Sequence, residues 1–310
     1  EKSSLAFPPS TGLEKLGPGM LAMTGASEYT GVTFIGDGTL RVGMLTDGRV
    51  AGGLGASTNA SANLVFNGGT LQYVGESSST NRGFTVSEFA RINIGHENTV
   101  ASFSGSISSG QDRLEKDGSG TLRLTGSANL AAMQVDQGRL LLETVDTNPS
   151  PGTFSPSNFS QSALTSVILG GGTFELRGAH EGNVTQNFGS QLTVGTGAST
   201  LKVTSVASSS IGSLTDPFTR LNLMGQEEIT PIIRKAGGTV HFVENPEGAA
   251  AADIFLYLPN EAIADQPNAA VLQPGRPDLP GDRRGVRDAF AYRAVAAAGG
   301  PRHCQGDRKS

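Results

Sequence analysis

Residues 17–43 read GPGMLAMTGASEYTGVTFIGDGTLRVG, and this stretch decides the fold. Apolar and polar residues alternate on both sides of a glycine turn: Val32 and Phe34 precede the turn, and Leu40 and Val42 follow it. A period of two with one apolar face indicates a short, half-buried β-strand. The stretch therefore predicts a strand, a glycine turn and a second strand.

Similar sequence returns about 100 residues later in the chain. Three pairs of segments occur in one order at nearly one spacing: LEKLGPGMLAMTG (13–25) with LEKDGSGTLRLTG (114–126), NGGTLQYVG (67–75) with GGGTFELRG (170–178), and, more weakly, RINIG (91–95) with QLTVG (191–195). We infer two long repeats, each built from several shorter strand–turn–strand units.

A unit this short cannot bury its own apolar face, so it must stack on its neighbours. At about 20–25 residues per coil, roughly 200 residues would form eight to ten coils whose strands lie about 4.8 Å apart. The sequence therefore predicts an all-β fold, a parallel β-helix with inward stacks of Leu, Val, Ile and Phe. A pair of β-sandwiches is the alternative, because an offset of about 100 residues also suits two such domains.

The quoted stretch resembles the autotransporter-associated β-strand repeat, a pattern of spaced glycines and alternating aliphatic residues. The second copy lacks the Tyr-Thr-Gly step and is one residue shorter. The repeat-defining residues are Gly17, Gly19, Leu21, Gly25, Tyr29, Gly31, Gly38 and Leu40 in the first copy, and Gly118, Gly120, Leu122, Leu124, Gly126 and Gly138 in the second.

The resemblance implies a right-handed parallel β-helix in a structural passenger segment of a bacterial exported protein, a surface-displayed or secreted scaffold or adhesion rod. It implies no catalytic, cofactor-binding or metal-binding residue. The partners it implies are a membrane β-barrel translocator encoded outside this chain, and surface glycans or other cell surfaces; open solenoid ends would allow self-association. The alternative is a glycan-binding or polysaccharide-degrading parallel β-helix.

Composition excludes several classes of protein. The 310 residues include 43 Gly, no Trp and only 16% charged residues, which disfavours helical bundles and coiled coils. A net charge of −5 disfavours a basic nucleic-acid-binding protein. No run of 18 apolar residues occurs, so no membrane-spanning helix is predicted. The single cysteine, Cys304, excludes an internal disulfide and a multi-cysteine zinc site.

The chain divides into four predicted parts: an N-terminal edge (1–12), a β-helix of two repeats with a degenerate extension (13–243), a linker (244–275) and a basic Arg/Pro/Ala-rich tail (276–310). The last part has eight basic and four acidic residues, unlike the acidic body. It is either a largely irregular, disordered linker or a non-native sequence, such as a frameshifted gene end. We expect the native product to extend upstream of Glu1 and to continue differently after about Gly275.

Polar residues near turns are the remaining candidate sites. Asp37 and Asp136 each lie close before a turn glycine. They could bind calcium, but the repeated G-G-x-G-x-D pattern is absent, and an Asp in such a turn ordinarily accepts bonds from nearby backbone N–H groups. The pairs His96–Glu97 and His180–Glu181 lack the H-E-x-x-H spacing, and the other histidines are isolated (His241 and His303).

No enzyme motif is found either. The chain has no G-x-S-x-G nucleophile elbow and no P-loop, and carboxylates are sparse in the repeats. The four tyrosines, which could stack on sugars, are scattered (Tyr29, Tyr73, Tyr257 and Tyr292). We therefore predict a structural protein and not an enzyme.

Overall fold

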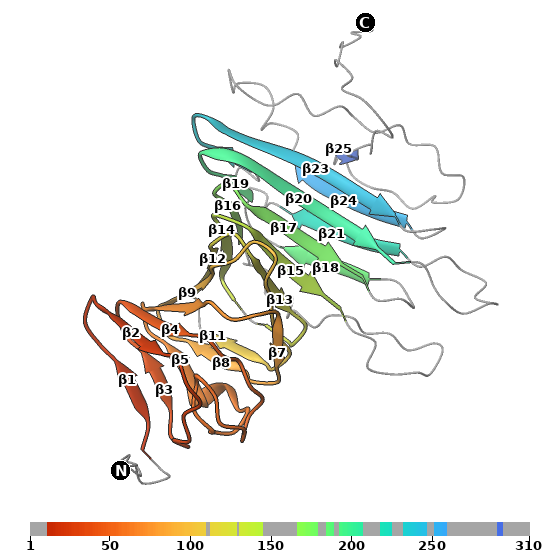
Figure 1. Ribbon diagram of the computed structural model, residues 1–310. Coiled ribbons are helices and arrows are strands. Elements are labelled where there is room, and N and C mark those ends of the chain that lie inside the picture. Colours follow the sequence, from red (N-terminus) through yellow and green to blue (C-terminus); the bar gives the residue numbers. More distant parts are fainter. Residues whose placement is uncertain are drawn as a thin grey trace, which may run out of the picture.

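The chain folds into a stack of short strands that rises from the N-terminal coils to the C-terminal ones (Figure 1). The computed structural model describes residues 11–109, 112–128, 130–144, 166–178, 184–188, 192–206, 218–224, 232–246, 251–258 and 290–293. Within these ranges the structure is strands and loops, with one short 3-10 helix, η1 (Ser61–Asn63). The all-β prediction is confirmed.

Two parallel sheets begin at the N-terminal end. Sheet I has five strands in the order β1 (Leu13–Lys15), β3 (Thr33–Ile35), β5 (Leu64–Phe66), β8 (Phe84–Val86) and β11 (Ile107–Ser109). Sheet II has nine strands in the order β2 (Met20–Met23), β4 (Thr39–Val42), β6 (Thr70–Tyr73), β9 (Phe89–Ile94), β12 (Arg113–Asp117), β14 (Ala132–Val135), β16 (Ser166–Leu169), β19 (Leu192–Val194) and β22 (Ile232–Arg234).

Two further sheets extend toward the C-terminal end. Sheet III has seven strands: β7 (Ser78–Thr80), β10 (Val100–Phe103), β13 (Thr121–Leu124), β15 (Arg139–Glu143), β17 (Thr173–Arg177), β20 (Gly197–Ser205) and β23 (Gly238–Pro246). Sheet IV has four strands: β18 (Val184–Phe188), β21 (Phe218–Met224), β24 (Ala251–Leu258) and β25 (Phe290–Arg293).

The chain passes from sheet to sheet around one axis. The strands β8, β9 and β10 form one coil through sheets I, II and III, and β16, β17 and β18 form a later coil through sheets II, III and IV. Sheet IV thus follows sheet III in the later coils, as sheet I does in the earlier ones. The nine strands of sheet II mark nine coils, within the predicted eight to ten.

Strand pairing decides between the two predicted architectures. Every pair within sheets I, II and III is parallel, as in Leu40 with Leu71 and Leu122 with Leu140. Antiparallel contact among the described residues is confined to β24 with β25 and an isolated Ser27–Gly52 bridge. The parallel β-helix is confirmed, and the β-sandwich alternative is wrong, since sandwiches are built from antiparallel sheets.

Rows of apolar side chains fill the interior along the axis. Leu122, Leu140, Phe174 and Leu201 are register partners on successive strands of sheet III, and all four are fully buried. Burying one such side chain stabilises the fold by about 1.5–3 kcal/mol. Stacking therefore supplies the core that a single coil lacks.

Three phenylalanines join the earlier coils. The rings of Phe66 and Phe84 lie edge to face at 5.4 Å, and those of Phe84 and Phe103 at 5.7 Å. Edge-to-face pairs contribute about 0.5–1.5 kcal/mol beyond burial. This cluster links sheet I with sheet III across the interior.

The inward face of β3 differs from the prediction by one residue. Thr33 and Ile35 are buried, whereas Val32 is 40% exposed and Phe34 is half-buried. Thr33 lies inside because its hydroxyl is hydrogen-bonded, to Tyr29 Oη at 2.8 Å and to the Leu54 carbonyl at 3.3 Å. A satisfied hydroxyl can replace an apolar side chain in the core, which alternation alone does not reveal.

The parallel stack extends beyond Val243, where the sequence analysis ended the β-helix. Strand β24 lies in the segment assigned to a linker and pairs in parallel with β21, and β25 lies in the predicted tail. Ala252 and Ile254 of β24 are buried beside their register partners Thr219 and Leu221 of β21, so β24 adds to sheet IV. The remainder of the segments 244–275 and 276–310, with Cys304, lies outside the described residues.

The two repeat copies occupy different faces of the β-helix. Segment 13–42 supplies β1 to β4 on sheets I and II, whereas the matching segment 114–142 lies on sheets II and III. The pair 67–75 and 170–178 is displaced in the same way, while the weak pair 91–95 and 191–195 lies on one sheet. The motif therefore specifies a corner between two strands and not a fixed position around the axis.

Candidate functional site: the lysine-centred corners and the charged outer faces

Lys15 is the centre of the corner between β1 and β2. Lys15 is 5% exposed. Its register partner on the next coil is Ile35, which is fully buried in the interior of the β-helix. The ammonium donates to three backbone carbonyls: Leu16 at 3.2 Å, Gly17 at 2.5 Å and Asp37 at 2.9 Å. One lysine thus binds its own turn to the turn of the next coil.

Lys116 repeats this arrangement 101 residues later in the chain. It lies in an inward row of sheet II between Ile92 and Val135 and is 0% exposed. Its ammonium donates to the carbonyls of Asp117 at 2.7 Å, Gly118 at 2.7 Å and Gln137 at 3.3 Å. Burial lowers the pKa of Lys116 to about 8, partly opposed by the nearby Asp117 carboxylate.

Glycines make these corners possible. Gly17 and Gly118 both have φ of 75°, and Gly38 and Gly138 have φ of 63° and 61°. A Cβ on Gly38 would collide with the carbonyl oxygens of Gly17 and Gly19 on the preceding coil, and one on Gly138 with those of Gly118 and Gly120. Left-handed φ and close backbone contact both require glycine there.

The other repeat-defining residues differ in how closely they are packed. Leu40, Leu122 and Leu124 are fully buried, and Leu21 packs against the core at its edge. A Cβ at Gly31 or Gly126 would meet the backbone of an adjacent coil, whereas Gly19 and Gly25 have open space around them. The predicted residues therefore lie along two corners and their strands, which belong to different sheets of the β-helix.

Lys15 and Lys116 lie within the repeated segments 13–25 and 114–126, but the sequence analysis does not identify them as candidate site residues. The signal was present: LEK occurs at 13–15 and 114–116, which places each lysine two residues after an inward leucine. By strand parity a charged residue at that position points into the interior. A buried lysine needs acceptors, and the adjoining glycine turn provides them as bare carbonyls.

Asp37 and Asp136 do not lie together. Asp37 Oδ1 accepts the Gly38 N–H at 2.6 Å, and Asp136 accepts from the side-chain amide of Gln134 at 2.8 and 3.0 Å. Both carboxylates thus bind local partners. In the described part of the chain no three His, Cys, Asp or Glu side chains converge on a point that could hold a metal ion.

The histidines that the structure describes are separate. His96 lies with Glu97 in the turn before β10, where its carbonyl accepts the Thr99 N–H at 3.0 Å. His241 lies on the exposed outer side of β23. His180, Glu181 and His303 are outside the described residues.

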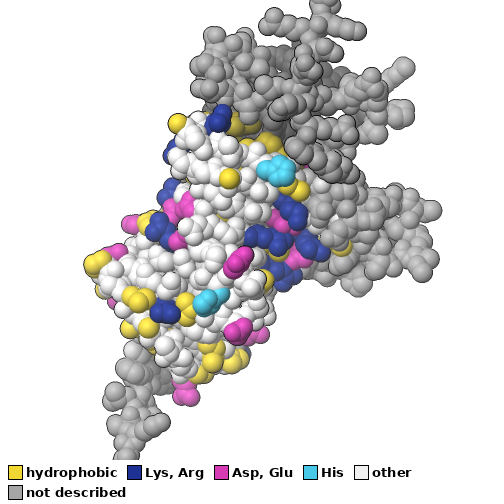
Figure 2. All heavy atoms as spheres, turned by 45° about the horizontal axis from the view of Figure 1, so that its top comes forward, with side chains coloured by type: hydrophobic (Ala, Val, Ile, Leu, Met, Phe, Trp, Pro, Cys, Tyr) yellow, Lys and Arg dark blue, Asp and Glu magenta, His cyan; other side chains and the backbone are white. Residues whose placement is uncertain are grey.

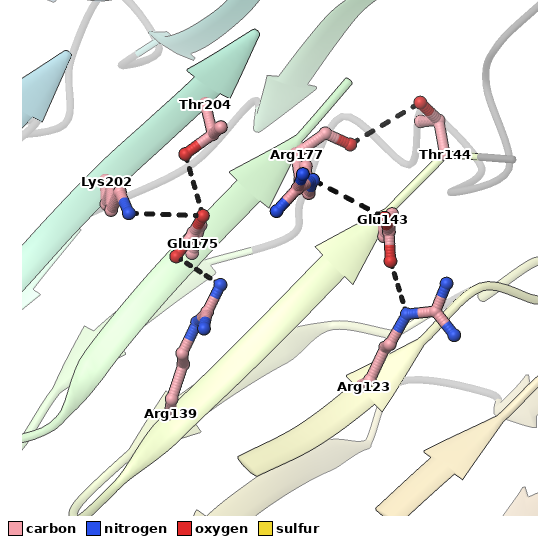
Figure 3. A network of polar contacts seen from close by, with 8 residues as sticks. All are labelled: Arg123, Arg139, Glu143, Thr144, Glu175, Arg177, Lys202 and Thr204. Carbon is pink, nitrogen blue, oxygen red and sulfur yellow. Dashed lines mark hydrogen bonds and ion pairs between the residues drawn. The ribbon is translucent and has the colours of Figure 1, made fainter. Parts of the chain in front are cut away.

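Ion pairs connect neighbouring strands on the outer side of sheet III (Figure 3). Glu175 accepts from Arg139 Nη2 at 2.7 Å and Thr204 Oγ1 at 2.7 Å, and Lys202 Nζ lies 3.5 Å away. Glu143 pairs with Arg123, and Arg177 Nε lies 3.5 Å from it. Each carboxylate therefore bridges cations on strands of different coils.

Sheet II carries a similar bridge. Glu115 Oε2 contacts Arg91 Nη2 at 2.7 Å, and Glu115 Oε1 contacts Arg113 Nη2 at 2.5 Å. The Glu115 side chain is 3% exposed, while both arginines are 43% exposed. A carboxylate this deeply covered requires such partners, because an unpaired buried charge is strongly destabilising.

A buried arginine fixes the long segment 43–60. The Arg82 guanidinium, 2% exposed, donates to five of its carbonyls, belonging to Thr46, Asp47, Val50, Gly55 and Ser57. Burial lowers its pKa, opposed by the nearby Tyr29 and Asp47. This loop of the second coil is thereby held against the coil that follows.

Comparison with known proteins agrees with this architecture. A model of the passenger-associated-transport repeat matches residues 13–42 and 114–142, the two segments that contain the lysine-centred corners. The Adhesin BmaC autotransporter of Brucella suis biovar 1 (strain 1330) is 35% identical over 174 residues, which cover 54% of this chain and 5% of that protein. No solved structure matches the chain.

No helix within the described residues is long and apolar enough to cross a membrane. The matched segments contain every repeat-defining residue that the sequence analysis named, and both carry the lysine, the paired glycines and the inward leucines. Residues 13–42 and 114–142 are therefore two passenger-associated-transport repeats, and the resemblance to autotransporter passenger repeats is confirmed.

Proposed function

We propose that this chain is a structural rod within an autotransporter passenger, displayed on the bacterial surface or secreted, where it spaces or presents adhesive parts. The observation that carries the proposal is the recurrence of one lysine-centred corner in both family-matched segments of a continuous parallel stack. A stack of coils held by backbone hydrogen bonds, buried lysines and bridging ion pairs suits a load-transmitting spacer. The adhesin relative supports an adhesive role for the larger protein.

The proposal includes a cognate outer-membrane translocator as the partner for export. The chain matches 5% of the length of the Brucella adhesin, so the translocator would lie outside the matched segment. The proposal assigns no enzymatic reaction to this segment. Its polar clusters are occupied by strand-to-strand pairing, as at Glu115 and Glu175.

Self-association through the first coil remains a prediction. Its strands β1 and β2 end sheets I and II among the described residues, and Leu16 and Met20 on this coil are 62% and 60% exposed. Exposed edge strands favour pairing with another chain. Sedimentation of the purified chain across a range of concentrations tests this.

Export provides the test of the proposed function. The chain is placed between a signal sequence and a β-barrel translocator in a Gram-negative host, and surface exposure is measured by protease digestion of intact cells. We expect the wild-type chain to reach the surface and the Lys15→Met/Lys116→Met variant to reach it less, with Arg41→Gln/Lys235→Gln as the matched control on exposed cations. A wild-type chain that stays in the periplasm contradicts the proposal.

A further inference from the structure

The outer side of sheet III carries more positive than negative charge. Four cations, Arg123, Arg139, Arg177 and Lys202, surround the two carboxylates of Glu143 and Glu175. We call these four cations the basic face. It lies on a chain whose formal net charge is −5, so the local excess runs against the overall balance.

The carboxylates lie beneath the cations. The Glu175 side chain is 2% exposed, against 36% for Arg139 and 29% for Lys202, and Glu175 also accepts from Thr204. Glu143 is 20% exposed, against 32% for both Arg123 and Arg177. A ligand approaching from solvent therefore meets ammonium and guanidinium groups first. Figure 2 shows Lys and Arg side chains on the visible face of the molecule, with Asp and Glu side chains among them.

The cations follow the axis of the rod. They come from β13, β15, β17 and β20, which are consecutive strands of sheet III. Adjacent strands lie about 4.8 Å apart, so the series extends over roughly 15 Å. Half-buried Thr121, Thr173 and Thr200 on the same strands add hydroxyl groups beside it. By register, Arg139 lies in the row of these threonines, Arg123 and Lys202 lie in the next outward row, and Arg177 lies in the row beyond. The donors therefore form a staggered band along the axis.

This geometry selects the kind of partner. The backbone groups of β13, β15 and β17 are already paired on both sides, so an extended peptide cannot add to the sheet there. Recognition must use side chains that project from the face. Guanidinium groups bind carboxylate and sulfate through paired N–H donors. A polymer with evenly spaced acidic groups can follow the series from coil to coil.

We propose that the basic face binds an acidic polysaccharide, sulfated or uronate-containing, laid along the rod axis. The proposal rests on the proposed function only in placing the chain outside the cell, where such polymers occur. Binding uses the partly exposed guanidinium groups and the Lys202 ammonium, while Glu143 and Glu175 keep the cations in position. We propose binding only, with no chemical change in the polysaccharide.

The test measures binding of the purified 310-residue chain to immobilised heparin, to polygalacturonate and to neutral dextran at low and at physiological salt. The Arg123→Gln/Lys202→Gln variant removes two cations and leaves each carboxylate one arginine partner. Arg41→Gln/Lys235→Gln removes two exposed cations elsewhere and serves as the control. Circular dichroism and thermal unfolding verify that both variants fold.

We expect the wild-type chain to bind heparin, polygalacturonate or both but not dextran, with affinity falling as salt rises. The Arg123→Gln/Lys202→Gln variant should bind at least tenfold more weakly, and the control within twofold of wild type. Absence of binding to both acidic polymers, or equal losses in the two variants, overturns the proposal. Competition by polyuridylate as strong as that by free heparin overturns the polysaccharide assignment in favour of nucleic acid. Because this assay needs no export, a failure of surface display leaves its result unaffected.

Discussion

Lys15 and Lys116 occupy equivalent points of two corners that lie on different faces of one β-helix. Each ammonium donates to three carbonyls, two in its own turn and one in the turn of the next coil. The lysines belong to sheet I and sheet II respectively, so the equivalence follows from the corner itself. In this chain, each passenger-associated-transport repeat contains a corner whose backbone carbonyls accept hydrogen bonds from a buried lysine ammonium.

Replacing Lys116 by Met should destabilise the protein by about 1–3 kcal/mol, because the carbonyls of Asp117, Gly118 and Gln137 lose their donor while the side-chain volume is kept. Chemical denaturation measures the free energy of unfolding. The control is Lys235→Met at an exposed position, which should change it by less than about 0.5 kcal/mol. Equal effects of the two substitutions would show that the Lys116 bonds contribute nothing.

The stability difference between wild type and Lys116→Met should increase with pH above about 8. The pKa of Lys116 is lowered from 10.5 to about 8 by burial, so between these values the unfolded chain holds the proton and the folded chain does not. Raising the pH therefore favours the folded wild type, by up to about 3 kcal/mol at pH above 10.5. Below about pH 8 the difference should be constant. Denaturation of both proteins from pH 7 to 10.5 measures it, and a falling difference contradicts the sign.

Alanine substitution should separate the two reasons for glycine at the corners. Gly138→Ala faces both a φ of 61° and collision with the carbonyls of Gly118 and Gly120, and should cost more than about 2 kcal/mol. Gly17→Ala has a φ of 75° with open space, and should cost about 1 kcal/mol. Gly43→Ala meets neither constraint and is the control. Thermal denaturation gives the order, and equal effects at Gly138 and Gly17 would remove the packing argument.

Replacing Arg82 by Met should release the loop 43–60 without unfolding the coils. The guanidinium donates to five carbonyls of the loop, whereas the strands β5 and β6 that follow are held by their own ladders. We expect backbone amides of the loop to exchange hydrogen at least tenfold faster, with amides of β6 unchanged. Arg41→Met, at an exposed position of β4, is the control. Uniform acceleration across both regions would indicate global destabilisation instead.

The family, the all-β class and the stacking could be predicted from the sequence because they depend on local patterns. Alternation of apolar residues specifies strands, and glycine pairs such as Gly118 and Gly120 specify where the chain turns. Unit length predicted eight to ten coils, and the nine strands of sheet II among the described residues fall within that range. The inward face of β3 could not be predicted in this way, since Thr33 is buried only through its bonds to Tyr29 and Leu54.

The sequence by itself determined that short glycine-separated strands must stack, because no single coil can bury its apolar residues. The tertiary structure decided which carbonyls surround Lys15 and Lys116, on which faces the two repeat copies lie, and which cations cover Glu143 and Glu175. These arrangements join residues of different coils. Coil lengths vary, with Leu122 pairing to Leu140 but Leu201 to Phe242, so no fixed spacing in the sequence gives the partner. Only the register of the completed stack brings these groups within hydrogen-bonding distance.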